Sequence, residues 1–314
     1  MKYLITGSVI VDNLKFVDGR FVEKLLGGCA IYSYYGVKLF EDDCACLAGV
    51  GEDFEALYGD WLRRNGMSEG GFLIRDPHTT QTILTYNDDG TYSCRSIYFD
   101  DVDGICIHNP ALSLTYSDLE PYLPGLKGLY LYSDIEQRYG NAYPLREKYG
   151  YKTMFECPGS MTSDYLPTFF KTIEQSDYYS FNRPESFSLF ETDSEEKVVE
   201  IVREIGLPCF YRVGTRGAYM LTADEGYFVP AVVIREPEDD IDPTGCGNSS
   251  TAACMWALTE GKSPLEACII GNVTAGFNAL QYGPPEDITG VSRNSAMAMI
   301  PELLEKYKNS ARIY

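Results

Sequence analysis

The sequence predicts an α/β protein: one domain, residues 1–314, built on a mostly parallel, doubly wound sheet with helices on both faces and a small β-sheet lid. The first reason is alternation, because short apolar runs of strand length recur between helical patterns along most of the chain. The second reason is a break in that alternation. Residues 81–86 and 91–98 alternate apolar and polar side chains on either side of Asp88-Asp89-Gly90, which is a strong hairpin signal.

The composition argues against several classes of partner. The chain has 26 basic and 46 acidic residues and a formal net charge of −20, which argues against nucleic acids and anionic membrane surfaces. Ten cysteines form no Cys-x-x-Cys pair and only two histidines occur, so we expect buried reduced thiols in a cytoplasmic protein rather than a His/Cys metal site. The apolar N-terminal run is interrupted by Gly7 and Asp12, and we expect neither a signal peptide nor a membrane span.

The first elements are short. Residues 3–6 form an apolar strand, and Asp12 follows it at a position where a lone Asp is usually a turn former. Residues 14–25 predict a small hairpin, and Gly27-Gly28 opens a helix to about residue 40 that is apolar on nearly every side and therefore buried. We expect the lid to consist of residues 13–25 and 72–107.

The middle of the chain predicts the body of the sheet. A buried strand at 45–50 precedes an amphipathic helix at 54–65. In a parallel sheet of this kind, functional sites lie at the carboxyl ends of the strands. Later buried strands are expected at 129–132, 152–155, 178–181 and 209–213.

Capping signals place the later helices. A Thr192-x-x-Glu195 capping box predicts a helix at about 194–205. The box Ser263-Pro264-Leu265-Glu266 begins a helix that runs to about Gln281, and Pro301 is expected to start a short last helix.

The stretch from Asp242 to Ala253 carries the strongest functional signal. Gly245 and Gly247 bracket Cys246, and a run of small residues follows up to the helix stop at Gly261. A glycine turn that feeds a helix N-terminus offers unpaired N–H groups and the positive end of the helix dipole to an anion. The same pattern is often only a turn. No Lys-Ser/Thr follows the glycines, so this is no Walker loop.

This stretch resembles the C-terminal signature of the ribokinase-like (PfkB) carbohydrate kinases, Asp-Thr-x-Gly-Ala-Gly-Asp before a small-residue helix. The resemblance extends over nearly the whole chain, from Gly7 to Gly283, and implies the ribokinase-like fold. In that family the glycine turn holds the transferred phosphoryl group, and the last Asp is the base that deprotonates the sugar hydroxyl. That position is Asn248 here, so the resemblance implies a divergent member with an amide in place of the carboxylate.

The resemblance also implies an acceptor site near the N-terminus. An Asp after a Gly-Ser strand end, here Asp12, binds sugar hydroxyls in the family, and the Gly27-Gly28 pair faces the sugar. The family has an Asn four residues after the second glycine, where this chain has Tyr32. The aromatic ring removes an amide and fills space, which puts an ordinary pentose or hexose in doubt.

A nucleotide and magnesium site is implied at the later strand ends. Asn182 and Glu185 match the Asn-x-x-Glu that the family ties to magnesium and phosphate, with Glu185 reaching Mg²⁺ through water; Pro184 could equally be only a helix start. Arg212 replaces the Thr of Thr-Leu-Gly-x-x-Gly, and its guanidinium could pair with phosphate, whereas Arg216 could serve only the following turn. The remaining implied nucleotide-site residues are Gly214, Gly217 and Asn272.

Two functions remain open at this point. The first is an ATP- and Mg²⁺-dependent kinase that phosphorylates a hydroxyl of a small sugar-like or nucleoside-like molecule. Gly245, Cys246 and Gly247 would form its anion hole, and Asp242, at the start of the motif, would be a further catalytic residue. The second is a catalytically impaired protein of this fold that binds nucleotide or metabolite without turnover. A homodimer through the β lid is one assembly that the resemblance allows.

Overall fold

A central sheet forms the body of the computed structural model, which describes residues 1–67, 69–87, 92–98, 109–132, 140, 142–159, 161–234, 242–288 and 290–313. Within these residues the sheet has ten strands in the order β14-β13-β12-β11-β10-β9-β8-β1-β4-β5. The pairs from β5 to β11 are parallel, and β12, β13 and β14 continue the sheet antiparallel. The strands are β1 (Tyr3–Thr6), β4 (Cys44–Gly51), β5 (Phe72–Asp76), β8 (Gly128–Tyr132), β9 (Lys152–Glu156), β10 (Tyr178–Asn182), β11 (Cys209–Arg212), β12 (Gly217–Leu221), β13 (Gly226–Pro230) and β14 (Arg312–Ile313).

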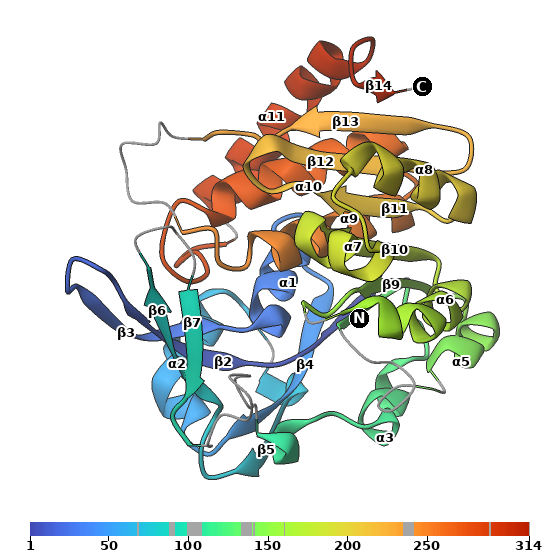
Figure 1. The fold of residues 1–314 in the computed structure, drawn as a ribbon. Helices are drawn as coiled ribbons and strands as arrows, with labels where there is room; N and C mark the ends of the chain where they lie inside the picture. Colours follow the sequence, from blue (N-terminus) through green and yellow to red (C-terminus); the bar gives the residue numbers. More distant parts are fainter. Residues whose placement is uncertain are drawn as a thin grey trace.

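Helices cover both faces of this sheet (Figure 1). One buried cluster lies under α1, α2, α9, α10 and α11, and the other lies under α3, α5, α6, α7 and α8. Successive strand residues face opposite clusters: Leu129 and Leu131 enter the second, while Tyr130 enters the first. This explains why the central strands, such as β1 and β8, are apolar on both faces. The helices are α1 (Cys29–Lys38), α2 (Phe54–Arg64), α3 (Tyr116–Leu119), α5 (Ala142–Tyr149), α6 (Leu166–Glu174), α7 (Arg183–Phe190), α8 (Glu195–Ile205), α9 (Cys246–Thr259), α10 (Pro264–Asn278) and α11 (Val291–Tyr307).

The contact between α1 and α9 fixes the position of the glycine turn. A Cβ at Gly36 of α1 would overlap the carbonyl of Ser249 in α9, so only glycine allows the two helices to approach this closely. The Ser33 hydroxyl of α1 donates to the Asn248 carbonyl at 3.4 Å. As a result the first turn of α9 is held against the beginning of α1, where Tyr32 lies.

A second, smaller sheet stands apart from the first (Figure 1). Its strand order is β3-β2-β6-β7, and it joins two hairpin-like pairs through a parallel contact between β2 and β6. A separate small sheet is therefore present where the lid was expected, although the turn expected at 88–90 lies outside the described residues. The strands are β2 (Ile10–Lys15), β3 (Phe21–Gly27), β6 (Gln81–Tyr86) and β7 (Tyr92–Ser96).

The expected lid boundary at residue 72 is wrong. β5 (Phe72–Asp76) pairs in parallel with β4 and forms the edge of the central sheet. At the other end, the small sheet begins at Ile10 and so includes Asp12, which the expected range 13–25 leaves out. The part of the expected lid at 99–108 lies outside the described residues.

One expected helix cap and one expected helix start are wrong, although α8 itself spans the expected residues. Helix α8 is capped by Ser194, whose side chain accepts the Lys197 N–H, rather than by Thr192. Helix α11 begins at Val291 and continues through Pro301. Its residues Ile300, Leu303 and Leu304 pack on the core on both sides of the proline, and that packing outweighs the lost hydrogen bond.

Among the described residues, no helix combines the length and the apolar character that crossing a bilayer requires.

Candidate active site

Two pockets meet at the N-terminus of α9. One, of about 420 Å³, is lined on this side by Pro243, Cys246 and Gly247. The other, of about 640 Å³, is lined by Thr244, Gly245 and Asn248. The short segment 243–248 therefore separates two cavities, and each cavity reaches the first turn of the helix.

The glycine turn is firmly built. Gly245 is the N-cap of α9 at φ 77°, a left-handed conformation that glycine adopts without strain. A Cβ at this position would overlap the ring of Tyr32. The Asp242 side chain is buried and accepts the Thr244 N–H at 2.9 Å, while Asn278 Nδ2 donates to the Thr244 carbonyl at 2.7 Å. Asp242 thus shapes the turn, and it lines neither pocket.

The expected anion hole is only partly free. The Cys246 N–H donates to the Pro243 carbonyl at 3.1 Å, so in this structure it is not available to a ligand. The Cys246 thiol donates to the Ala275 carbonyl at 3.4 Å, and burial raises the pKa of the thiol to about 11. Cys246 therefore anchors the turn against α10.

The larger pocket brings together most of the residues expected to face an acceptor. Asp12, Gly28 and Tyr32 line it from β2, the start of α1 and α1 itself. Gly27 does not line it: its backbone lies directly under the Asp12 carboxylate, which a Cβ would displace. The Tyr32 ring is buried between this pocket and the turn, where burial followed by the charges of Asp12 and Asp242 raises the pKa of its hydroxyl.

Asp12 is a buried carboxylate at the floor of the small sheet. Burial raises its pKa to about 6, although the Thr82 hydroxyl donates to Asp12 Oδ1 at 2.7 Å and opposes the shift. The Asp242 charge adds to the rise. Asp12 therefore changes charge close to neutral pH, and a ligand hydroxyl that donates to it would compensate for the lost water.

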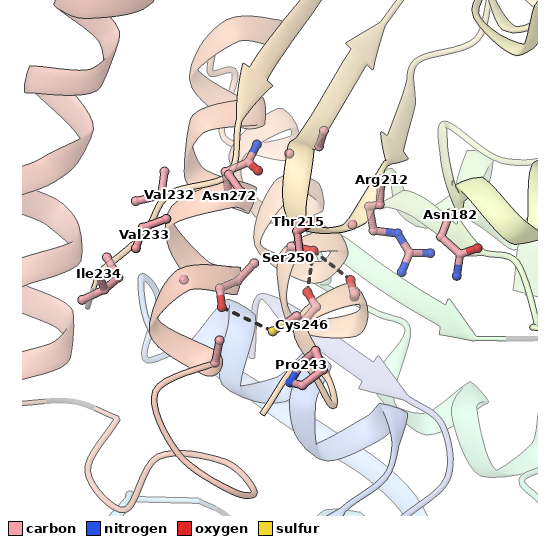
Figure 2. A pocket seen from close by; sticks show the side chains of 18 of the residues that line it. Asn182, Arg212, Thr215, Val232, Val233, Ile234, Pro243, Cys246, Ser250 and Asn272 are labelled. Carbon is pink, nitrogen blue, oxygen red and sulfur yellow. Dashed lines mark hydrogen bonds between the residues drawn. The ribbon is translucent and has the colours of Figure 1, made fainter. Parts of the chain in front are cut away.

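The smaller pocket has an apolar side and a polar side (Figure 2). Val232, Val233 and Ile234 lie on one side, and Arg212 and Asn182 lie on the other. The other residues expected at a nucleotide site that line the pocket are Gly214, Gly217 and Asn272.

Asn272 is buried in the middle of α10, although a mid-helix Asn is usually solvated. Its Nδ2 donates to the Cys268 carbonyl at 3.0 Å, while the side chain borders the pocket.

Glu185 lies next to the smaller pocket but does not line it. It forms a capping box with Asn182: Glu185 Oε2 accepts the Asn182 N–H and Oε1 accepts Asn182 Nδ2, both at 2.7 Å. Burial raises its pKa. Among the described residues there is no cluster of three acidic, His or Cys side chains that could enclose a metal. This carboxylate fits Mg²⁺ only as an outer ligand through water, since both of its oxygens already accept hydrogen bonds.

An ion pair at the strand ends was not expected from the sequence. Glu156, at the end of β9, accepts from Arg212 Nη1 at 3.0 Å and from Asn248 Nδ2 at 3.1 Å, both through Oε1. Its other oxygen accepts the Tyr130 hydroxyl. The Glu156 side chain is 2% exposed and that of Arg212 is 11% exposed. The two are therefore a buried ion pair, and the Glu156 oxygen that binds Arg212 also accepts from the Asn248 amide.

Arg212 lies across the first turn of α9. A Cβ at Gly247 would overlap Arg212 Nη1. Arg212 Nε donates to the Ser180 hydroxyl at 3.1 Å, and Nη2 is 3.6 Å from Glu185 Oε2. Burial lowers the pKa of the guanidinium, but the carboxylates of Glu156 and Glu185 outweigh burial and leave it raised.

Comparison with known proteins relates part of the chain to a kinase family. The sequence model of the pfkB family carbohydrate kinases matches residues 156–289, which include the strand ends and the glycine turn. This part of the chain is therefore similar to that kinase family. A search of curated protein sequences gives no significant match.

Solved structures of low sequence identity share the whole fold. A probable sugar kinase from Rhizobium etli is 19% identical with a TM-score of 0.76, and the match covers 95% of this chain and 98% of that chain. Adenosine kinase from Sinorhizobium meliloti is 20% identical with a TM-score of 0.75 and coverage of 95% and 98%. A Burkholderia thailandensis nucleoside kinase in complex with inosine is 18% identical with a TM-score of 0.71 and coverage of 96% and 97%. These matches confirm the ribokinase-like fold.

Proposed function

We propose that this protein is a PfkB-type kinase that transfers the terminal phosphoryl group of ATP to a hydroxyl of a sugar-like or nucleoside-like molecule. The observation that carries the proposal is the pair of pockets that meet at residues 243–248. Phosphoryl transfer requires the attacking and leaving oxygens to lie roughly in line on opposite sides of the phosphorus. A donor pocket and an acceptor pocket on either side of one helix N-terminus supply that arrangement.

The smaller pocket suits the donor. Its apolar side would hold a flat base near Val232, and Asn272 on α10 would offer polar contacts at the base edge. Arg212 and the first turn of α9 lie at the polar end, where the phosphates would be neutralised. Mg²⁺ carried by the phosphates would supply further neutralisation, with Glu185 as a water-mediated ligand.

The larger pocket suits the acceptor. The ionised Asp12 carboxylate would accept hydrogen bonds from two ligand hydroxyls, which is the usual role of a carboxylate in polyol recognition. Tyr32 occupies part of this pocket, and its buried ring reduces the space left for an acceptor. The volume, about 640 Å³, is large enough for a nucleoside as well as for a sugar.

The absence of a carboxylate at Asn248 does not forbid transfer. A positioned general base contributes ~10²–10⁴-fold, whereas positioning and charge stabilisation supply most of the acceleration of a loose phosphoryl transfer. We therefore expect a slow kinase.

A non-catalytic binding protein is the second candidate. One observation favours it: Asn248 Nδ2 and Arg212 Nη1 are both bound to Glu156, so the two groups nearest the phosphoryl site are already paired. Such a protein would bind nucleotide and metabolite in the same pockets without turnover.

A transfer assay separates the two candidates. The purified protein is incubated with γ-labelled ATP, Mg²⁺ and a panel of sugars and nucleosides, and acceptor-dependent labelled product is measured. The Asp12→Asn variant serves as control, since it keeps the volume of the acceptor pocket but removes its charge. The kinase predicts product that falls at least tenfold in the variant, on the order of one lost charged hydrogen bond. Stabilisation by ATP–Mg²⁺ and by an acceptor, with no product from that acceptor, would favour the binding protein.

A further inference from the structure

We infer that Glu156 acts as an internal anion at the phosphate site: it holds Arg212 over the first turn of α9, and a phosphate must displace it from Arg212 to bind there. The inference rests on the proposed function, because it concerns the donor phosphate of that site. Its evidence is the geometry of Glu156, Arg212 and α9.

Glu156 lies close to the N-terminus of α9. Glu156 Oε1 lies 3.9 Å from the position that a Cβ on Gly247 would take, so the carboxylate stands at the mouth of the first helical turn. A helix N-terminus attracts an anion, and a cation alone would be unfavourable there. Arg212 nevertheless lies over Gly247. The negative charge of Glu156 makes that position stable for the guanidinium.

Both carboxylate oxygens of Glu156 already accept hydrogen bonds. Glu156 Oε1 accepts from Arg212 Nη1 at 3.0 Å and from Asn248 Nδ2 at 3.1 Å, and Oε2 accepts the Tyr130 hydroxyl. These donors are the kind that a phosphate oxygen would use. The carboxylate thus occupies two of the donors beside the helix terminus, Arg212 Nη1 and Asn248 Nδ2.

The second terminal nitrogen of Arg212 also supports the inference. Arg212 Nη2 is buried and has no hydrogen-bond partner within the described part of the chain. It is 3.6 Å from Glu185 Oε2, which is too long for a good hydrogen bond. An unsatisfied buried guanidinium nitrogen beside a helix N-terminus indicates that a further anion belongs at this site. A terminal phosphate that paired with Nη1 and Nη2 together, in the bidentate geometry of a guanidinium, would satisfy Nη2 and would require Glu156 to leave Nη1.

Charge decides what happens when the phosphate arrives. The cluster of Glu156, Glu185 and Arg212 has a net charge of −1 when all three are ionised, and the protein as a whole carries −20. The arriving phosphate therefore competes with Glu156 for one guanidinium. Removing the Glu156 charge should tighten binding of any phosphate at this site and should leave binding of a ligand without phosphate unchanged.

The test is calorimetric titration of the Glu156→Gln variant with pyrophosphate, ADP and adenosine. Gln keeps the size of the side chain and an oxygen that accepts from Asn248 Nδ2. We expect pyrophosphate and ADP to bind roughly 10–100-fold more tightly than to the parent, the range expected for one charge-assisted hydrogen bond. Adenosine should bind equally to both proteins. Equal or weaker ADP and pyrophosphate binding by the variant overturns the inference.

A matched control is Asp177, which lies at the amino ends of the same strands, whereas Glu156 lies at a carboxyl end. Asp177 precedes β10 and pairs with Arg146 and Lys152, each at 3.0 Å. Asp177→Asn also removes an ion-paired carboxylate, and it should leave the affinity for pyrophosphate unchanged. A tenfold gain in this control as well would mean that overall charge, not Glu156, sets the affinity, and would overturn the inference.

A second variant guards against misfolding of the first. Glu156→Asp keeps the charge but withdraws it from Arg212 by one methylene, so phosphate affinity should rise by a smaller factor. No change in Glu156→Asp would overturn the inference if Glu156→Gln does not fold.

These titrations, taken together with the transfer assay, separate this inference from the proposed function. If Glu156→Gln binds ADP more tightly and the parent transfers phosphate to no acceptor, the inference is supported and the kinase is contradicted. Transfer by the parent with unchanged ADP affinity in Glu156→Gln leaves the kinase standing and overturns the inference. No binding of ADP, pyrophosphate or adenosine by either protein contradicts both.

Discussion

At the scale of single residues, Asn248 is held by a carboxylate. Its Nδ2 donates to Glu156 Oε1 at 3.1 Å while the side chain borders the acceptor pocket. The amide therefore has a structural partner, and its identity depends on Glu156. An acid at this position would face another acid.

We predict that Asn248→Asp lowers stability and does not raise turnover. The substitution removes the Nδ2 donor and places a carboxylate about one hydrogen-bond length from that of Glu156. We expect this to lower the free energy of unfolding by roughly 1–3 kcal/mol. Thermal unfolding and the transfer assay measure the two effects. The double variant Asn248→Asp/Glu156→Gln is the control, since it restores a donor opposite the new acid and should recover stability. Faster transfer by Asn248→Asp alone would show that only a base is missing.

Asp12 predicts a pH dependence of acceptor binding. Its pKa of about 6 in the folded protein lies above the ordinary value of 3.8. Between these values the folded protein binds the proton more strongly than the unfolded chain, so ionising Asp12 costs stability as the pH rises, and this cost is complete above about pH 6. Acceptor affinity should follow the ionised form and fall by about tenfold per pH unit below pH 6.

Calorimetric titration of an acceptor between pH 5 and pH 8 measures this dependence. The Asp12→Asn variant should bind weakly with a flat profile, and it should gain stability relative to the parent above pH 6. Acceptor affinity that is unchanged between pH 5 and pH 7 in the parent would contradict the role of Asp12.

At the scale of elements, the glycine turn can be separated into backbone and packing contributions. Gly245 and Gly261 have nearly the same φ, 77° and 76°. A Cβ at Gly245 would overlap the Tyr32 ring, whereas a Cβ at Gly261 would meet nothing within 4 Å. The two glycines therefore form a matched pair.

We predict that Gly261→Ala costs about 1–2 kcal/mol, the usual penalty of a left-handed alanine. Gly245→Ala should cost about 1–3 kcal/mol more, because Tyr32 must move. Denaturant unfolding of both variants measures the difference. Equal losses would mean that Tyr32 does not hold the turn.

Much of the site could be predicted at this scale because its parts follow local rules. The glycine turn, the Ser263 cap and the strand ends that carry Asn182 and Arg212 each have a short sequence signal, and the structure places them as predicted. Parallel pairing then brings the strand ends to one edge of the sheet. The functional roles of these residues remain predictions.

The features that the sequence did not reveal depend on distant partners. Glu156 looks like the last residue of an apolar strand, and only Arg212 and Asn248, both far along the chain, give it a role. A signal was present, since an acidic residue directly after a buried strand lies at the functional edge of the sheet. β5 was misassigned for the same reason, because its partner β4 decides its sheet. Pro301 stays inside α11 because core packing outweighs local propensity.

At the scale of the whole molecule, the small sheet is coupled to the glycine turn. The Tyr86 hydroxyl on β6 lies 3.4 Å from the Thr244 hydroxyl, and the Tyr86 ring stacks on Phe16 at 5.3 Å. Asp12 lies on β2 of the same sheet. An acceptor bound between Asp12 and Thr244 would therefore contact both the small sheet and the turn that precedes α9.

We predict that a bound acceptor slows hydrogen exchange in the small sheet. The backbone amides of β6 and β7 should gain protection, since a ligand that joins two bodies suppresses their separate opening. Helix α8, on the opposite face of the central sheet, is the internal control and should not change. Exchange in β6 and β7 that stays the same with a bound acceptor would contradict this coupling.

The measurement that tests the central claim most directly is a crystal structure with a non-hydrolysable ATP analogue and Mg²⁺. The claim is that a donor and an acceptor meet at the N-terminus of α9. It predicts the base beside Val232 and Asn272, and the terminal phosphate at the first turn of α9, facing the pocket of Asp12, with Arg212 turned from Glu156 to the phosphate. An analogue whose phosphates point away from residues 245–247, or that binds outside this pocket while the Glu156–Arg212 pair stays closed, would contradict it.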